Sequence, residues 1–131
     1  MKSKYIYISV SILLVILFSL LLLPFFRLPQ ERKKINISGK EISVWVARTD
    51  KEREQGLQNI MWLPKNTGML FIFSKQSNRC FWNKNTFLKL KLIFLKEGKE
   101  VKASHLSSIW EGKKTICSDL PVDSVLELVC E

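Results

Sequence analysis

An unbroken apolar run near the N-terminus limits the possible folds of this chain more than any other feature. Residues 5–26, YIYISVSILLVILFSLLLLPFF, include no charged side chain. As a helix these residues would extend about 33 Å, enough to cross a hydrocarbon core of about 30 Å. A buried core helix is the alternative, but no polar stripe interrupts the run, and so small a domain could not surround it. The run therefore predicts an N-terminal transmembrane helix within residues 1–26.

The same run could be a retained anchor or a cleaved signal peptide. The apolar part of a signal peptide is usually about 7–15 residues long and ends at a pair of small residues. Here the run is longer and ends in LLLPFFRL, without such a pair. We therefore expect an uncleaved signal-anchor. Basic residues flank both ends of the run, so its orientation is nearly balanced, and the positive-inside rule alone leans weakly toward a cytoplasmic C-terminal domain. The very short N-terminal flank fits a signal-anchor with an exported domain equally well.

The chain is basic, with 21 Lys and Arg against 12 Asp and Glu and a net charge of +9. Residues 75–102 carry eight of the basic side chains and only two acidic ones. Such a surface favours anionic lipid headgroups, acidic glycans or nucleic acid. A lysine-rich surface that only keeps the protein soluble is the simpler interpretation.

Cysteine and histidine are too few for a usual metal site. The three cysteines are Cys80, Cys117 and Cys130, with no CxxC spacing, and His105 is the single histidine. A zinc site would need all four side chains to converge. We therefore expect no metal and no cofactor. In an exported domain one cysteine pair could form a disulfide and leave one thiol over, and the sequence does not say which pair.

The remaining residues predict a small all-β domain. Residues 27–40, RLPQERKKINISGK, have the composition of a basic linker, so we expect the domain to cover residues 41–131. Alternating apolar residues predict strands over 41–47 and 87–95, and apolar runs predict strands over 68–73 and 124–129. Thr49 and Glu52 form a capping-box pattern for a short helix over 50–56 that ends at Gly56, and Gly98 suits a hairpin turn. Short strands with turn signals imply a β-sandwich or barrel.

The segment FWNKNT, residues 81–86, is the best candidate for a site. Trp82 offers a stacking face, Lys84 a positive charge, and Asn83, Asn85 and Thr86 donors and acceptors for hydrogen bonds. This combination suits a sugar or another polar ligand. The alternative is structural, because Asn and Thr at a strand end often satisfy backbone groups in turns.

Sequence motifs of known catalytic sites are missing. The chain has no GxSxG elbow, no HExxH and no glycine-rich phosphate loop. A small hydrolase or lyase that uses His105 or a cysteine together with Lys84 and Asn85 remains the alternative to a binding domain. That alternative requires His105 and a cysteine or carboxylate to meet within about 3.2 Å in one pocket with the FWNKNT segment.

The ordered motifs ISVWVARTDKEREQGL, LPKNTGMLFIF, FWNKNT, LIFLKEGKEV and VLEL resemble the domain of unknown function 192 family. The resemblance runs from Glu41 to Leu128. It implies an all-β, jelly-roll-like sandwich with a short helix near its start. Because members often follow a signal sequence or anchor, it also favours export of the C-terminal domain. The family motif positions fall on Gly56, Gly68, Met69, Phe71, Phe73, Phe81, Trp82, Lys84, Asn85 and Thr86.

The chain also departs from the family pattern. Asn83 replaces the family's Met, and Lys91 stands where the family has an aspartate. The usual Arg after Gly-Leu-Met is missing near Asn59, and the chain ends at Glu131, short of the family's C-terminal segment. We therefore interpret it as a divergent, C-terminally short member.

These observations lead to one functional expectation. We expect a membrane-anchored envelope domain that binds a polar or anionic ligand or a protein partner and catalyses no reaction. The expected partners are the membrane, through a single-pass anchor, and a glycan, an anionic lipid or an envelope protein; nucleic acid is not expected. The family itself implies no established activity.

Overall fold

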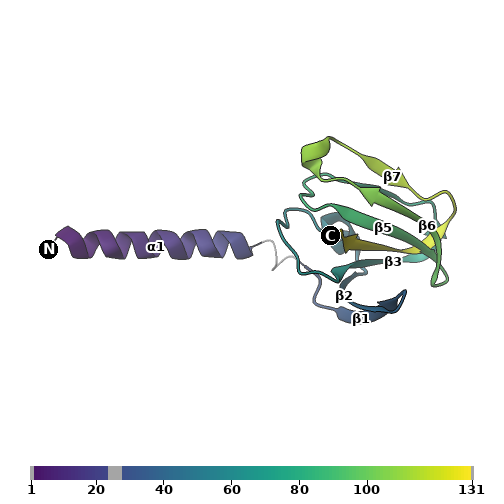
Figure 1. Cartoon of the computed structure of the whole chain (residues 1–131), viewed down its shortest axis with the longest axis horizontal. Coiled ribbons are helices and arrows are strands. Elements are labelled where there is room, and N and C mark those ends of the chain that lie inside the picture. The colour runs from purple at the N-terminus through teal and green to yellow at the C-terminus, as the bar shows by residue number, and fades with distance from the viewer. Residues whose placement is uncertain (1, 24–27, 131) are drawn as a thin grey trace.

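The computed structural model of the protein describes residues 2–23 and 28–130 (Figure 1). Helix α1 spans Lys2–Leu22, and no part of its Tyr5–Leu22 segment is buried against the protein. In the described part of the chain, only this segment is long and apolar enough to cross a membrane, a criterion that an N-terminal signal sequence also meets. Residues 24–26 of the predicted span and Arg27 of the predicted linker lie outside the described residues.

A six-stranded mixed sheet forms the centre of the domain, in the order β1-β2-β3-β8-β5-β6 (Figure 1). Its strands are β1 (Arg32–Ile37), β2 (Lys40–Ala47), β3 (Thr67–Ser77), β5 (Leu90–Lys96), β6 (Lys99–Leu106) and β8 (Val122–Val129). A second sheet pairs β4 (Cys80–Trp82) with β7 (Thr115–Cys117). The short helix α2 (Asp50–Gln55) and the 3-10 turn η2 (Ile109–Glu111) lie in the connections.

The main core lies between the large and the small sheet. Phe81 of β4 contacts Phe71 and Phe94 of the large sheet edge-to-face, at ring-centroid distances of 4.9 and 6.1 Å. Ile116 of β7 joins the same cluster of buried side chains. The mostly β architecture with two packed sheets is consistent with the expected β-sandwich-like fold. The pair β2–β3 is parallel, unlike the antiparallel strands of a jelly roll.

The opposite face of the large sheet carries a smaller apolar cluster. Ile42, Val44, Ile93 and Leu126 are buried there, and partly buried isoleucines of β1 pack against them. The prediction that residues 27–40 form a linker is therefore wrong for the strand β1, which pairs with β2 along its full length. The sequence RKKINI has only two apolar residues, and they contribute to this face as part of a hairpin.

Local sequence signals place several elements correctly. The Thr49 hydroxyl accepts from the Glu52 backbone N–H at 3.2 Å, and the Glu52 carboxylate accepts from the Thr49 N–H at 2.9 Å, so the predicted capping box starts α2. Gly56, at φ +49°, ends it. In β5, Leu90, Leu92 and Phe94 point to the main core, as their alternation predicts. The strand predicted over 87–95 begins only at Leu90, and β3 continues past Phe73 to Ser77.

Candidate functional site

Three loops meet at one end of the domain: residues 57–66, 83–89 and 107–114. Asn59 donates its backbone N–H to the carbonyl of Asn85 at 2.8 Å, which joins the first loop to the second. Ile109 donates to the carbonyl of Thr86, also at 2.8 Å, which joins the third loop to the second. We call this region the three-loop end. It carries most of the predicted FWNKNT site.

Asn83 fixes the three-loop end from inside. Its side chain is buried and donates to the carbonyls of Ser107 and Gly112 at 3.1 and 2.7 Å. Its side-chain oxygen accepts from the backbone N–H of Lys114 at 2.8 Å. Because these three bonds use most of its hydrogen-bonding capacity, Asn83 has the structural role that the sequence left open as an alternative.

Thr86 also faces the interior. Its side chain is buried, and its hydroxyl donates to the carbonyl of Lys84 at 3.2 Å. Asn85 adopts a positive φ of 50°, a conformation that Asn tolerates better than most residues, and its side chain is exposed. Of the five predicted ligand contacts, the structure leaves Trp82, Lys84 and Asn85 accessible to a ligand.

An open cleft of about 520 Å³ lies beside these accessible residues. It is lined by Trp82, Asn83, Lys84, Asn85, Ile109, Lys113, Lys114 and Thr115. We call it the Trp82 cleft. The indole of Trp82 is 57% exposed, and the Lys84 ammonium lies 5.1 Å from the centre of its ring. Lys114 also lines the cleft, and its Nζ donates to the backbone carbonyl of His105 at 3.1 Å.

The lining of the Trp82 cleft has one sign of charge. Lys84, Lys113 and Lys114 are among its lining residues, and none of the lining residues is acidic. Sequence reasoning missed Lys113 and Lys114, because they lie about thirty residues from FWNKNT along the chain. The bonds of Asn83 and the pairing of β4 with β7 bring them to it. A ligand here would meet an aromatic face and several cations.

A second basic pocket lies on the other side of Trp82. The guanidinium carbon of Arg79 is 3.9 Å from the centre of the Phe73 ring, and that of Arg53 is 5.2 Å from the same ring. Glu54 also lines this pocket. Burial, together with the nearby charge of Arg53, lowers the pKa of Arg79. Its buried Nε has no hydrogen-bond partner. Trp82 therefore lines both the Trp82 cleft and this second pocket, and each has more basic than acidic lining residues.

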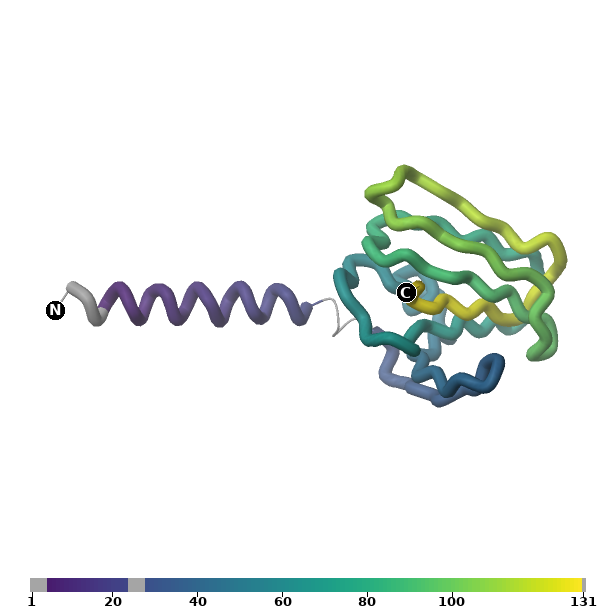
Figure 2. Tube along the Cα trace, viewed as in Figure 1, coloured from purple at the N-terminus to yellow at the C-terminus, as the bar shows by residue number. Residues whose placement is uncertain are grey.

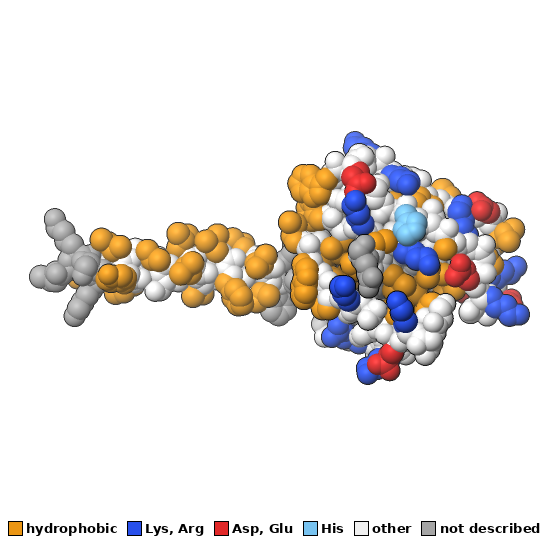
Figure 3. All heavy atoms as spheres, viewed as in Figure 1, with side chains coloured by type: hydrophobic (Ala, Val, Ile, Leu, Met, Phe, Trp, Pro, Cys, Tyr) orange, Lys and Arg blue, Asp and Glu red, His pale blue; other side chains and the backbone are white. Residues whose placement is uncertain are grey.

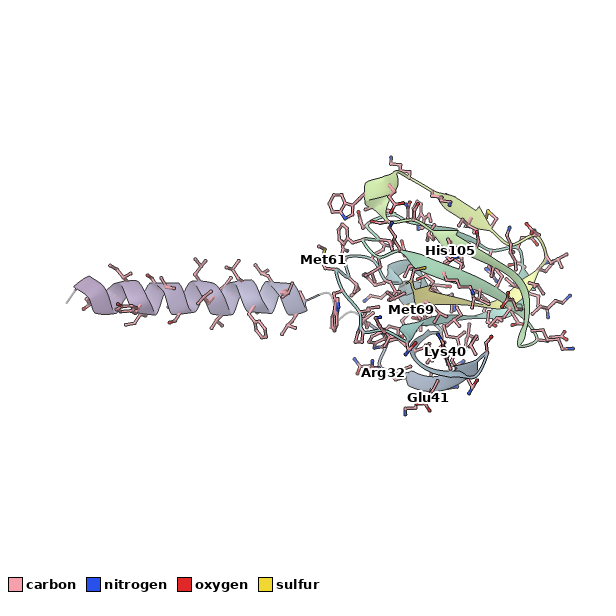
Figure 4. All side chains as sticks on the ribbon, viewed as in Figure 1. Arg32, Lys40, Glu41, Met61, Met69 and His105 are labelled. Atoms are coloured by element: carbon pink, nitrogen blue, oxygen red, sulfur yellow. A yellow bond between two sulfur atoms is a disulfide. The ribbon has the colours of Figure 1, made fainter. Side chains whose placement is uncertain are left out.

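His105 and Cys130 form a separate pair on the outer face of the large sheet. The Cys130 Sγ and the His105 Nδ1 are 3.5 Å apart. Side chains alternate along a strand, so His105 lies on the face opposite the buried Leu106, and Figure 4 shows it there. Neither residue lines the Trp82 cleft. The convergence that the enzymatic alternative requires is therefore not present.

Burial also makes the Cys130 thiol a weak nucleophile. It raises the pKa of Cys130, and the nearby charges of Lys91 and Lys89 offset that effect only in part. The thiolate, which is the reactive form, is therefore scarce at neutral pH. Lys91, which replaces the aspartate expected from the family pattern, lies on this same face opposite His105 in the strand pairing.

The other two cysteines form a disulfide that joins the strands of the small sheet. Cys80 of β4 and Cys117 of β7 are bonded at 2.08 Å, and Cys130 is free. The sequence allows one pair with one thiol left over, and the structure identifies the pair. Because Trp82 and Thr115 lie on the same two strands, the disulfide also holds one wall of the Trp82 cleft.

Comparisons with known proteins locate relatives of the domain. Residues 33–130 match the model of the DUF192 family, described as "Uncharacterized ACR". A solved structure from Sinorhizobium meliloti 1021, described as "a putative transcription regulator", is 31% identical with a TM-score of 0.66, over 76% of this chain and 78% of that chain. A protein of unknown function from Novosphingobium aromaticivorans is 20% identical with a TM-score of 0.64, over 75% and 71% of the two chains, and shows a shared fold. No curated protein sequence matches the chain.

Proposed function

Since the chain belongs to the DUF192 family, whose description assigns no activity, we propose its function from the Trp82 cleft: binding of an acidic sugar by a membrane-anchored, exported domain. The domain would act as a binding module and would leave its ligand unchanged. One observation carries this proposal. Three lysines, an exposed indole and the side chain of Asn85 line one cleft that contains no carboxylate.

The chemistry of the lining favours a sugar that carries a negative charge. An exposed indole provides a flat apolar face of the kind that packs against a sugar ring. The lysine ammonium groups attract a carboxylate or phosphate, and Asn85 can bond to hydroxyls. A neutral sugar would leave the three lysines without a counter-charge. An acidic sugar satisfies both the aromatic and the cationic part of the cleft.

Two features support the anchored and exported location. The Tyr5–Leu22 segment of α1 has the length and composition of a membrane span. The Cys80–Cys117 disulfide belongs to a class of bond that persists in oxidising compartments and is rare in the cytosol. An exported domain attached by α1 would meet sugars of the cell envelope.

The proposal is tested by calorimetric titration of the full chain in detergent with glucuronic acid, glucose 6-phosphate and neutral glucose. We expect binding of the two acidic sugars and weaker binding of glucose. A Trp82→Ala variant should lose about tenfold in affinity, because the comparable flat-face contact between a nucleic-acid base and an aromatic side chain is worth about 1–3 kcal/mol. A double Lys113→Gln, Lys114→Gln variant should lose the preference for acidic sugars.

Lys99→Gln is the matched control, because it removes one lysine at the distant β5–β6 turn. It should bind like the unmodified chain. Equal affinity of the Trp82→Ala and unmodified chains for all three sugars would refute the site. A short DNA duplex is the second control, given the description of the Sinorhizobium protein. Among the described residues, the helices are an apolar α1 and a six-residue α2, so no long basic helix is available for a DNA groove.

A further inference from the structure

Three large apolar side chains at the three-loop end are largely exposed to solvent. Met61 is 60% exposed, Trp62 66% and Trp110 75%. The Trp110 ring stacks on Phe87 at a centroid distance of 5.4 Å. Neighbouring positions in the same loops, such as Ile60 and Leu63, are buried. The exposed side chains are therefore the tips of loops whose bases are anchored in the core. We call Met61, Trp62, Phe87 and Trp110 the apolar tip.

The apolar tip lies on the side of the domain from which α1 extends. Figure 4 shows Met61 at the edge of the domain next to the end of α1, and the green turn η2 lies on that side in Figure 1. Apolar side chains, drawn in orange, gather on the same edge in Figure 3. The backbone bonds of Asn59 and Ile109 to the 83–89 loop hold the two tip loops together.

The chain between α1 and the domain is too short to let this end move far from a membrane. Leu28 is already part of the main core, and α1 ends at Leu22. Five residue steps from Leu23 to Leu28 span at most about 18 Å, because an extended chain advances about 3.3–3.6 Å per residue. If α1 crosses a bilayer, Leu28 must therefore lie close to the headgroup layer.

Lysines outnumber acids beside the apolar tip, since Glu111, the residue after Trp110, is paired with Lys89 at 2.8 Å. Ile109, next to Trp110 in the chain, lines the Trp82 cleft together with Lys84, Lys113 and Lys114. Tryptophan is the residue type most enriched at the boundary between lipid and water, and a basic residue near an anionic leaflet contributes about 1 kcal/mol. Interfacial amphipathic helices combine the same two elements, with Trp or other apolar side chains on one face and Lys or Arg on the other.

We propose that the three-loop end docks on the lipid headgroup layer, with Trp62, Met61 and Trp110 inserted at the boundary and the cleft lysines over anionic phospholipid headgroups. The docking rests on the membrane-anchoring part of the proposed function, since α1 supplies the tether. It orients the Trp82 cleft toward the membrane surface. The sugar ligand of the cleft would then be reached at the bilayer and not in open solution.

The experiment uses the full chain reconstituted in vesicles that contain lipids brominated near the top of the acyl chain. Bromine quenches tryptophan fluorescence on contact, α1 contains no tryptophan, and the four tryptophans are Trp45, Trp62, Trp82 and Trp110. We expect quenching in vesicles that contain phosphatidylglycerol. A double Trp62→Phe, Trp110→Phe variant should lose most of the quenched fraction. The matched control, Trp45→Phe, replaces a tryptophan that is buried in the core and should keep it.

The dependence of quenching on the charge of the lipid and of the cleft lysines gives a second test with the same kind of vesicle. In phosphatidylcholine alone, or after replacement of Lys84, Lys113 and Lys114 by Gln, the quenched fraction should fall. Quenching that the double tryptophan variant leaves unchanged would overturn the docking. So would an absence of quenching together with crosslinks between copies of the chain, which would mean that the apolar tip is covered by a protein.

The two proposals fail in different ways. Flotation of the chain with vesicles of phosphatidylcholine alone, where docking is expected to be weak, reports the anchor. Sugar titration in detergent measures ligand binding at the Trp82 cleft in the absence of a bilayer. Quenching without sugar binding would therefore leave docking intact and remove the sugar ligand. Flotation without quenching would leave the anchor and the cleft intact and remove the docking.

Discussion

Glu127 shows how one residue can make the stability of this domain depend on pH. It lies on the central strand β8, is 5% exposed and is paired across the sheet with Met69 and Leu92. Burial raises the pKa of Glu127 to about 8. The carboxyl group is therefore protonated in the folded domain at neutral pH, although it would be ionised in the unfolded chain.

The sign of the effect on stability follows from this difference. The folded state holds the proton more tightly than the unfolded state, so the free energy of unfolding falls as the pH rises from about 4.5 to about 8. We expect a Glu127→Gln variant to lose most of this decline and to unfold at a higher denaturant concentration than the unmodified chain at pH 8. Urea unfolding at several pH values measures it. Parallel pH profiles for the two chains would contradict a buried, proton-holding Glu127.

At the same scale, the sequence predicts only part of the candidate site. The aromatic and charged character of Trp82 and Lys84 is visible in the sequence, and both are accessible in the structure. The burial of Asn83 is not visible, because its bonding partners lie more than twenty residues away. The same long-range bonds bring Lys113 and Lys114 to the cleft. A local pattern cannot report a contact that only the fold creates.

Strand β3 contains a position where only glycine fits. A Cβ atom placed on Gly68 would lie 2.0 Å from the carbonyl oxygen of Glu127 on the adjacent strand β8. We expect Gly68→Ala to lower the free energy of unfolding by about 1–3 kcal/mol or more, because the two strands must move apart to accommodate the methyl group. Chemical denaturation measures the loss. Gly98→Ala is not a neutral control, since its φ of +74° is itself strained for alanine.

A better control is Ser104→Ala on β6. It replaces one small side chain by another, so we expect no new close contact with a neighbouring strand. Its stability should change little. If Gly68→Ala unfolds at the same denaturant concentration as Ser104→Ala, the close approach of β3 and β8 is not present in solution.

Elements with a strong local signal are predicted, and those without one are missed. The capping box of α2 and the alternation of β5 are complete within a few residues. Strands β4 and β7 have only three residues each, too few to show a period of two, and their pairing depends on residues 37 positions apart. β1 has a polar sequence on an edge of the sheet. Its backbone pairing with β2 stabilises it more than the burial of its few apolar side chains.

For the whole molecule, the proposed export gives a prediction about compartments. In a Gram-negative bacterial host, a fusion of alkaline phosphatase after residue 130 should be active, and the same fusion of β-galactosidase inactive. Deletion of residues 2–23 should reverse both results, because α1 would be the export signal. Thiol labelling of the denatured, unreduced chain should modify Cys130 alone, with Cys80 and Cys117 protected by their disulfide. Active β-galactosidase in the full-length fusion would place the domain in the cytoplasm.

The central position of β8 has a consequence for the order of synthesis. Figure 2 shows this C-terminal strand, in yellow, running through the sheet, and its neighbours on either side are β3 and β5. Among the described strands of this sheet, β8 alone pairs with both the β1-β2-β3 part and the β5-β6 part. A nascent chain therefore cannot complete the sheet until residues 122–129 have left the ribosome.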